Sequence, residues 1–267
     1  MALTDFDEYV DKLKENRVAD FITSTIRITR PNASWQSFNP TPATPTTSVA
    51  LDKTSAQSMG FIPAVSTGRL TMLGARISTS LQAAASMMVV DLLNVSGGLN
   101  GTLTTAQTTN LPTAALTRHT SGEGVMAGIV IYTIIGTTAT TVTISYTNSA
   151  GTSGRTSTAT TIGGGFYREV GLLIPIPLQA GDTGIRSIES VTLTATTGTA
   201  GNFGVCLFKP LAMISLESAT GVMPLDSVST GCIIGSLCEI HPDACLTVSA
   251  VTVVNFSITG ALILGEV

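Results

Sequence analysis

Short runs of Val, Ile, Leu and Thr recur between residues 68 and 196, and clusters of Gly, Ser and Asn separate them. Apolar runs that alternate with polar residues and end in turn-forming residues are typical of β-strands. The pattern therefore predicts a body built from strands. The clearest predicted strands are residues 69–77, 86–95, 125–135, 140–147 and 169–176.

Two neighbouring pairs of apolar runs are separated by short loops that contain glycine. Residues 125–135 and 140–147 flank Gly136, and residues 185–196 and 203–208 flank a Gly- and Thr-rich loop. Strands that such a short loop joins commonly pair antiparallel with each other. We therefore predict one β-hairpin from each pair.

Two later segments alternate between apolar and polar positions. In residues 185–196, a period of two predicts Ile188 on one face of a strand and Val191 on the other. In residues 246–264, most apolar residues share one parity, which fits one long strand or two strands broken at Gly260. Both segments extend the predicted β-structure toward the C-terminus.

The first residues differ from the rest because charged side chains are concentrated there. Within residues 4–20, Phe6, Val10, Leu13 and Arg17 follow the spacing of one face of an amphipathic helix. We therefore predict an N-terminal α-helix. It either packs on its own domain or docks as an arm on a neighbouring subunit.

An extended segment is predicted after this helix. Residues 21–29 read as a first strand or an extended arm, and three prolines in residues 39–47 favour an extended path without sheet pairing. This Pro/Thr-rich segment serves as a strap on a surface or as a plain linker. The candidate interaction residues of the arm are Phe6, Val10, Leu13, Arg17, Phe21, Arg27 and Arg30.

These patterns predict a mainly β protein with two parts. Residues 1–60 form the N-terminal helix and extended arm, and residues 61–267 form an antiparallel β-sandwich of jelly-roll type. The chain is long enough for one large β-domain or two small ones.

Charge and hydropathy narrow the classes of partner. The net charge is −4, so the chain lacks the basic field that holds nucleic acid. The apolar stretch at residues 124–135 is too short for a spanning helix, and residues 246–264 contain many polar positions, so we expect no membrane span. We see no signal peptide and expect synthesis in the cytoplasm. The mean hydropathy of +0.41 is high, which predicts extensive burial between proteins.

One triplet matches a catalytic signature. Asp182-Thr183-Gly184 has the sequence of the aspartic protease motif, whose chemistry needs two carboxylates that share a proton. No second such triplet occurs in the chain, and Ala180-Gly181 before it favours a turn. We therefore interpret Asp182 as part of a β-turn, with a homodimeric protease as the alternative.

Cysteine and histidine offer one further candidate site. Cys232, Cys238, His241 and Cys245 could supply a tetrahedral metal site, but the gap between the first two exceeds the usual zinc spacing. Buried free thiols are the other interpretation. Only His119 and His241 are available as bases, and no nucleophile, phosphate-binding or dinucleotide motif accompanies them. We therefore expect no enzymatic activity, no cofactor and no small-molecule substrate.

The stretch from Ala180 to Phe208 resembles segments of structural proteins of tailed-bacteriophage virions. A polar N-terminal arm before a Thr/Gly-rich β-body is likewise similar to capsid decoration (cement) proteins. The resemblance implies a virion protein that stabilises the capsid by bridging its subunits, with the major capsid protein or other virion proteins as partners. It also implies a homo-oligomer, for which a trimer is plausible. The alternative is a tail, baseplate or fibre component that takes part in host attachment.

Overall fold

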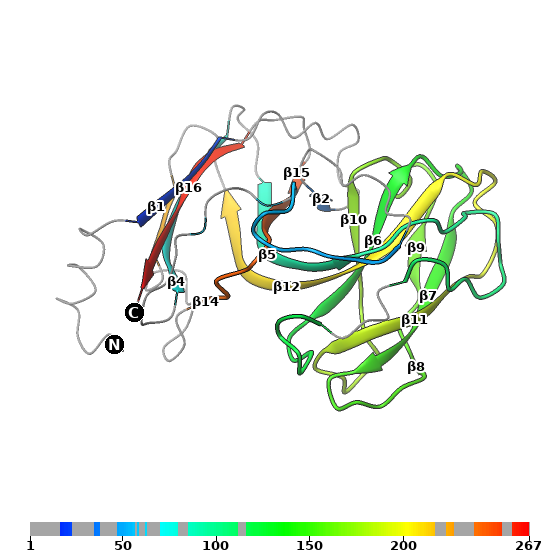
Figure 1. The fold of residues 1–267 in the computed structure, drawn as a ribbon. Helices are drawn as coiled ribbons and strands as arrows, with labels where there is room; N and C mark the ends of the chain where they lie inside the picture. Colours follow the sequence, from blue (N-terminus) through cyan, green and yellow to red (C-terminus); the bar gives the residue numbers. More distant parts are fainter. Residues whose placement is uncertain are drawn as a thin grey trace.

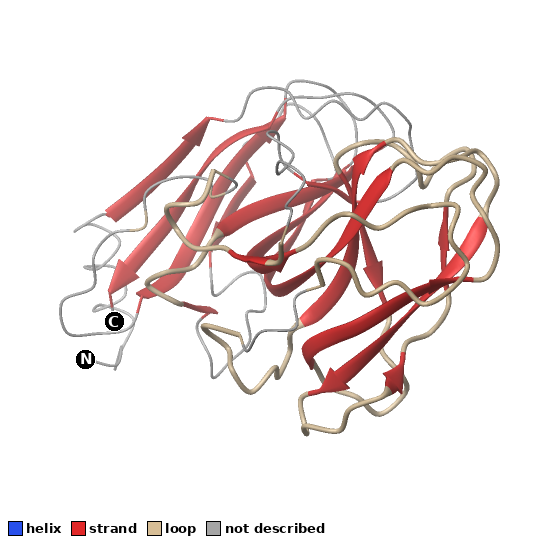
Figure 2. Ribbon diagram, turned by 45° about the vertical axis from the view of Figure 1, so that its right-hand side comes forward, coloured by secondary structure: helices blue, strands red, loops and turns tan. Residues whose placement is uncertain are grey.

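The computed structural model is mainly β in the part of the chain that it describes. That part comprises residues 17–22, 35–37, 47–56, 58, 62, 70–79, 85–111, 116–216, 223–226, 238–252 and 258–266. These residues form antiparallel sheets, turns and loops but no α-helix (Figure 1 and Figure 2). None of them belongs to a helix with the length and apolarity needed to cross a membrane.

The largest sheet closes on itself. Its strands are β2 (Trp35–Ser37), β3 (Val49–Ala50), β5 (Ala85–Val95), β6 (Met126–Thr133), β10 (Leu172–Ile176), β12 (Asn202–Leu216) and β15 (Leu246–Thr252). The order is β12-β6-β10-β2-β15-β5-β3, and β12 also pairs with β5, which closes all of them except β3 into a ring. The long strand β12 permits this closure, because its first part pairs with β6 and its later part with β5. Closure removes the free edges on which other chains can pair.

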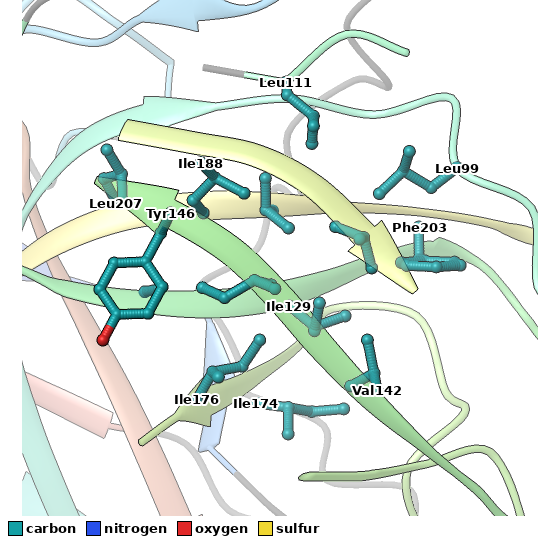
Figure 3. Packing of buried hydrophobic residues seen from close by; sticks show 14 of the residues in the cluster. Leu99, Leu111, Ile129, Val142, Tyr146, Ile174, Ile176, Ile188, Phe203 and Leu207 are labelled. Atoms are coloured by element: carbon teal, nitrogen blue, oxygen red, sulfur yellow. The ribbon is translucent and has the colours of Figure 1, made fainter. Parts of the chain in front are cut away.

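A second sheet packs on this ring. Its strands are β7 (Thr140–Asn148), β8 (Arg155–Thr156), β9 (Thr160–Ile162) and β11 (Ile185–Leu193), and β7 pairs with the other three. Apolar side chains of β7 and β11 share one buried cluster with side chains of the ring, among them Ile129, Tyr146 and Phe203 (Figure 3). The two layers are therefore held together by a common hydrophobic core.

The ring strands carry apolar side chains on their other face as well. Val130 and Tyr132 of β6 join Phe208 of β12 and Leu51 in a second buried cluster, whereas Ile129 belongs to the first. Strand β6 is thus buried on both faces, which explains why its sequence is apolar almost without interruption. Strand β7 is buried on one face only, and its sequence alternates.

A third sheet joins both ends of the described chain. Its strands are β1 (Arg17–Ile22), β4 (Leu70–Thr79), β13 (Met223–Asp226), β14 (Cys238–Ile240) and β16 (Ile258–Glu266). The order is β1-β16-β4-β13, with β14 also paired to β4. Arg17 lies opposite Leu264, and Ile22 lies opposite Thr259. This sheet lies at the left of Figure 1, on the other side of the ring from β7 and β11.

Both predicted hairpins are wrong, although their strands are present. Strand β6 pairs with β10 and β12, while β7 pairs with β8, β9 and β11. Likewise β11 lies in the second sheet and β12 in the ring. Each short loop therefore crosses from one layer to the other. The physical reason is burial: β6 and the first part of β12 are covered on both faces, and β7 and β11 are not, so neighbours in sequence belong to different layers.

The prediction that Ile188 and Val191 lie on opposite faces of β11 is wrong, because the strand contains two β-bulges. The register shifts between Ile185 and Ser187 and again between Ile188 and Ser190. Each shift inserts one residue and reverses the parity, so Ile185, Ile188 and Val191 are all buried on one face. The C-terminal segment contains two strands, which was one of the two alternatives, but the predicted break at Gly260 is wrong because Gly260 lies inside β16, opposite Ile77.

The N-terminal helix predicted for residues 4–20 is not supported. Arg17 to Asp20 belong to β1, and residues 1–16 lie outside the described part of the chain. Val18, Phe21 and Ile22 are residues that favour strands, and pairing of all six residues with β16 gives them sheet hydrogen bonds. The Pro/Thr-rich segment also lies outside the described residues, apart from its last position.

Candidate interaction surface

Four loops meet at one end of the two-layered body, and Thr197 connects three of them. Thr197 is fully buried; its N–H donates to the carbonyl of Gly101 at 2.8 Å, and its own carbonyl accepts from Thr138 N–H at 3.0 Å. Its hydroxyl accepts from Gly136 N–H at 3.0 Å and donates to the Thr199 carbonyl at 2.9 Å. These bonds fix the loops after β5, β6 and β11 against one another.

Two glycines allow this close approach. A Cβ at Gly136 would lie 1.6 Å from the Thr197 carbonyl oxygen. A Cβ at Gly163 would lie 2.5 Å from the Thr138 carbonyl oxygen, and Gly163 has a φ of +78°. No other residue fits at either position without moving the backbone. The fourth loop, residues 163–171, thereby packs against the loops after β6 and β11.

This end of the molecule exposes apolar side chains on constrained loops. Phe166 is 53% exposed, Val170 is 46% exposed, and Leu103 in the loop after β5 is 47% exposed. Phe166 lies in a turn closed by hydrogen bonds in both directions between Gly163 and Tyr167, at 2.8 and 3.3 Å. Tyr167 packs on the first cluster, which anchors the turn and leaves Phe166 outside. We call Leu103, Phe166 and Val170 the apolar loop end.

Asp182 lies in a turn, as interpreted from the sequence. Its N–H donates to the Gln179 carbonyl at 3.0 Å, and Gly181 has a φ of +91°. The Asp182 carboxylate accepts hydrogen bonds from Tyr146, from Asn148 at 2.7 Å, and from Arg155 at 3.0 and 3.2 Å. These bonds, with those from Arg155 the strongest, lower the pKa of Asp182 from 3.8 to about 2. The carboxylate therefore joins β7, β8 and the turn before β11.

A second polar network lies inside the molecule. Asp91 of β5 pairs with Arg118 and also accepts the Cys245 N–H at 2.9 Å. Arg118 donates further to the carbonyls of Leu51 and Leu92, at 2.5 and 2.8 Å. Burial, the largest single influence, raises the pKa of Asp91, but the interactions with Arg118 and His119 together outweigh it and hold the pKa below 3.8. The network joins β5 with the loop after β3, the loop that carries Arg118 and the segment directly before β15.

The cysteine cluster is only partly within the described residues. Cys232 lies outside them, and Cys238 is placed by its backbone in β14. Cys245 is a buried free thiol, and burial raises its pKa to about 12. The rings of His119 and His241 meet edge to face, with centroids 6.4 Å apart. In the described part of the chain, no three His, Cys, Asp or Glu side chains are arranged to hold a metal ion.

The arm residues that the structure describes, Arg17 and Phe21, lie in the third sheet and not at the apolar loop end. Arg17 and Phe21 lie in β1, opposite Leu264 and Gly260, while the others lie outside the described residues, namely Phe6, Val10, Leu13, Arg27 and Arg30. Sequence reasoning did not single out Phe166. An aromatic pair directly after Gly163-Gly164-Gly165 is the one signal that could have indicated it.

Comparisons with known proteins do not assign the chain to a family. No family model matches it, and no curated protein matches its sequence. A solved structure that it is similar to is described as the crystal structure of the infectious bursal disease virus VP2 subviral particle. That match has 12% sequence identity and a TM-score of 0.18, and it covers 94% of this chain and 81% of that chain. A TM-score of this size does not establish a common fold.

Proposed function

We propose that this chain is a non-enzymatic virion structural protein that decorates a bacteriophage capsid and stabilises it by bridging capsid subunits. In this proposal the ring and the second sheet together serve as the β-sandwich body with jelly-roll topology, and the chain assembles as a trimer. The resemblance of residues 180–208 to segments of tailed-phage virion proteins supports this role.

The apolar loop end carries the proposal. Exposed apolar side chains that share one loop commonly mark contact sites for other proteins. Phe166 and Val170 lie on a loop that hydrogen bonds and glycine contacts hold in place, so little conformational entropy is lost when a partner covers them. A rigid contact of this kind suits permanent attachment to a shell.

The use of charged residues supports a role without catalysis. Asp91 and Asp182 each accept several hydrogen bonds from within the fold. Their partners Arg118 and Arg155 connect strands and loops. Both carboxylates thus act as structural anchors. The N-terminal arm, including Arg17 and Phe21, is proposed to add a second contact to neighbouring capsid subunits.

Capsid binding tests the proposal. Shells of the cognate virus that lack this protein are mixed with wild-type chain or with a Phe166→Ser/Val170→Ser variant, and bound protein is measured by co-sedimentation. We expect binding to weaken at least about tenfold, equal to about 1.4 kcal/mol. Met213→Ser is the matched control, because Met213 is 64% exposed but lies on β12 away from the loops. Equal binding by the double variant and wild type would contradict the proposed contact.

The alternative is a tail, baseplate or fibre component that attaches to the host. One observation favours it: the exposed ring of Phe166 offers a flat apolar face, which is the type of surface on which sugars stack. Binding of the purified protein to host cells, lost in the Phe166→Ser variant and absent toward capsids, would favour this alternative.

A further inference from the structure

Both histidines of the chain meet at one place in the fold. The sequence contains two, His119 and His241. His119 lies in the loop before β6, and His241 lies in the turn between β14 and β15. Their rings meet edge to face, with centroids 6.4 Å apart. The imidazole side chain changes charge between about pH 5 and 8, so the side chains most suited to respond to mild acid are neighbours. We call these two residues the histidine pair.

His119 places its ring against the buried ion pair of Asp91 and Arg118. Its Nε2 atom lies 3.3 Å from Oδ2 of Asp91 and is buried, but it has no hydrogen-bond partner among the described residues. The backbone of His119 has a φ of +52°, in the left-handed region that residues with a side chain seldom adopt. The tertiary structure, rather than a local preference, therefore holds the ring at this carboxylate.

His241 fixes the turn that leads into β15. Its Nδ1 atom accepts the N–H of Asp243 at 3.1 Å, and its carbonyl accepts the N–H of Ala244 at 2.9 Å. The next residue, Cys245, donates its N–H to Oδ1 of Asp91 at 2.9 Å. An imidazole nitrogen can accept a hydrogen bond only while it carries no proton. The hydrogen bond within this turn therefore requires an uncharged His241 ring.

The carboxylates nearest the histidine pair already have cationic partners. Asp91 is paired with Arg118. Oδ1 of Asp243 lies 3.0 Å from Nζ of Lys53, which also donates to the Pro242 carbonyl at 3.1 Å. The other charged side chains on the strands and loops around the pair are exposed or half-buried, namely Asp52, Glu123, Lys209 and Glu239. Asp91 attracts a charge on His119, but one carboxylate cannot balance two cations, so a proton on the ring adds net positive charge beside Arg118.

We propose that the histidine pair is an acid-sensitive latch between the loop that carries Arg118 and the turn before β15. In neutral solution both rings are uncharged and the latch is closed. Below about pH 6 the rings take up protons, so they repel each other and Arg118, and His241 loses the hydrogen bond from Asp243. Water solvates both charged rings in the open form. Protons therefore bind the open form more readily, and the closed form loses population as the pH falls.

Opening of the latch has a local consequence. The turn from His241 to Cys245 separates from Asp91, while the ring and the second sheet keep their shared core. The thiol of Cys245, which is buried in the closed form, becomes accessible. Cys206 is fully buried in β12 and stays covered. The two thiols therefore distinguish local opening from unfolding of the whole body.

Thiol labelling of the free chain tests the latch. 4,4′-Dithiodipyridine, which reacts with thiols in mild acid, is added at about pH 7.5 and about pH 5.5, on either side of the imidazole transition. Peptide mass spectrometry gives the labelling rate of each cysteine. Wild type is compared with His119→Asn/His241→Asn. Asparagine tolerates the left-handed backbone at position 119, and at position 241 its amide oxygen can accept the Asp243 N–H without gaining charge.

The expected difference appears only in acid. At about pH 5.5, Cys245 should react at least about tenfold faster in wild type than in the variant, since uptake of one proton favours the open form about tenfold per pH unit. At about pH 7.5 the two rates should agree within about twofold, because both rings of wild type are then uncharged. Cys206 should stay unlabelled in both proteins at either pH.

Two results overturn the proposal. One is equal labelling of Cys245 in wild type and in the variant at about pH 5.5, with both proteins folded by circular dichroism. The other is labelling of Cys206 together with Cys245, which would show that acid unfolds the body rather than opening the turn. If the double variant does not fold, His119→Gln/His241→Gln replaces it. No capsid is present in the experiment, so its outcome is independent of the proposed function.

Discussion

Arg118 and Asp91 form a bidentate ion pair in the interior. The Nε atom of Arg118 lies 2.7 Å from Oδ2 of Asp91, and its Nη2 atom lies 2.6 Å from Oδ1. The side chains are 2% and 1% exposed, so water does not screen the pair. A buried pair of this kind contributes little compared with an apolar replacement of both residues, but loss of one partner leaves a charge without compensation.

Replacement of Arg118 alone is therefore expected to be strongly destabilising. Arg118→Met should lower the free energy of unfolding by about 3–5 kcal/mol, because Asp91 stays buried without its partner. Urea denaturation followed by circular dichroism measures the change. The double variant Asp91→Leu/Arg118→Met is expected to recover part of the loss.

The surface ion pair of Lys53 and Asp243 provides the control. Its side chains are 37% and 60% exposed, so Lys53→Met should cost less than about 1 kcal/mol. Equal losses of unfolding free energy in Arg118→Met and Lys53→Met would show that the interior pair contributes no more to stability than the surface pair.

Acid is expected to weaken the turn that Asp182 holds. The pKa of Asp182 is lowered to about 2 in the folded state, below its ordinary value of 3.8. A lowered carboxyl pKa stabilises the folded state above the unfolded pKa, and this stabilisation is lost as the pH falls through the folded pKa. Melting temperatures of wild type and Asp182→Asn, measured between about pH 5 and 2, should therefore converge toward the acid end.

Asp182→Asn also tests the protease alternative. If Asp182 serves only the turn, the variant should assemble into virions as wild type does once it is folded. Loss of a cleavage product in virions that carry the variant would instead support the protease interpretation.

The glycines of the loop end allow a matched pair of substitutions. Gly136→Ala should destabilise the protein by about 1–3 kcal/mol, because its Cβ would overlap the Thr197 carbonyl oxygen. Gly165→Ala is the control, since a Cβ there meets no atom within 4 Å. Thermal unfolding should leave the control within about 1 kcal/mol of wild type. A tolerated Gly136→Ala would mean that the loops around Thr197 are not tightly joined.

The buried thiols should resist alkylation in the folded protein. Burial raises the pKa of Cys206 well above its ordinary range and that of Cys245 to about 12, and only the thiolate reacts. Iodoacetamide at about pH 8 should leave both unmodified until denaturant is added, as read by peptide mass spectrometry. Rapid modification of Cys245 without denaturant would indicate that the segment before β15 opens readily.

Capsid binding through an apolar contact should depend little on salt. Screening weakens contacts between exposed charges, and the apolar loop end has Leu103, Phe166 and Val170 as its contact residues. Co-sedimentation with shells at about 0.5 M salt should therefore match that at low salt. A collapse of binding would point to the charged arm, with Arg17, as the main contact.

The sequence located many strands but not their partners. The alternation of Thr140 to Thr147 and the apolar run of 86–95 each predict a strand correctly, because both are local properties of the chain. Pairing is a property of the whole fold: β6 and β7 are joined by a short loop yet lie in different layers. The bulge at Glu189 shifted the parity of β11 in the same way, and no local signal marks a bulge in a Thr-rich strand.

The candidate surfaces were harder to predict than the strands. Phe166 follows a Gly-rich turn, but its exposure depends on the packing of the next residue, Tyr167, against the core. The register of β7 with β11, which brings Thr143 opposite Thr192, likewise depends on the whole fold. By contrast, the turn at Asp182 was predictable, because Ala180-Gly181 fixes its local geometry.

Strand β2 closes the ring, and it comes from far away along the chain. Its three residues pair with Leu172 and Leu173 of β10 and with Ser249 and Ala250 of β15, all more than a hundred positions distant. Contacts at such separation form late in folding, so the ring is expected to be completed by the arrival of this strand. The single tryptophan of the chain, Trp35, lies in β2. Its fluorescence therefore reports when β2 joins the ring, independently of the folding of the second sheet.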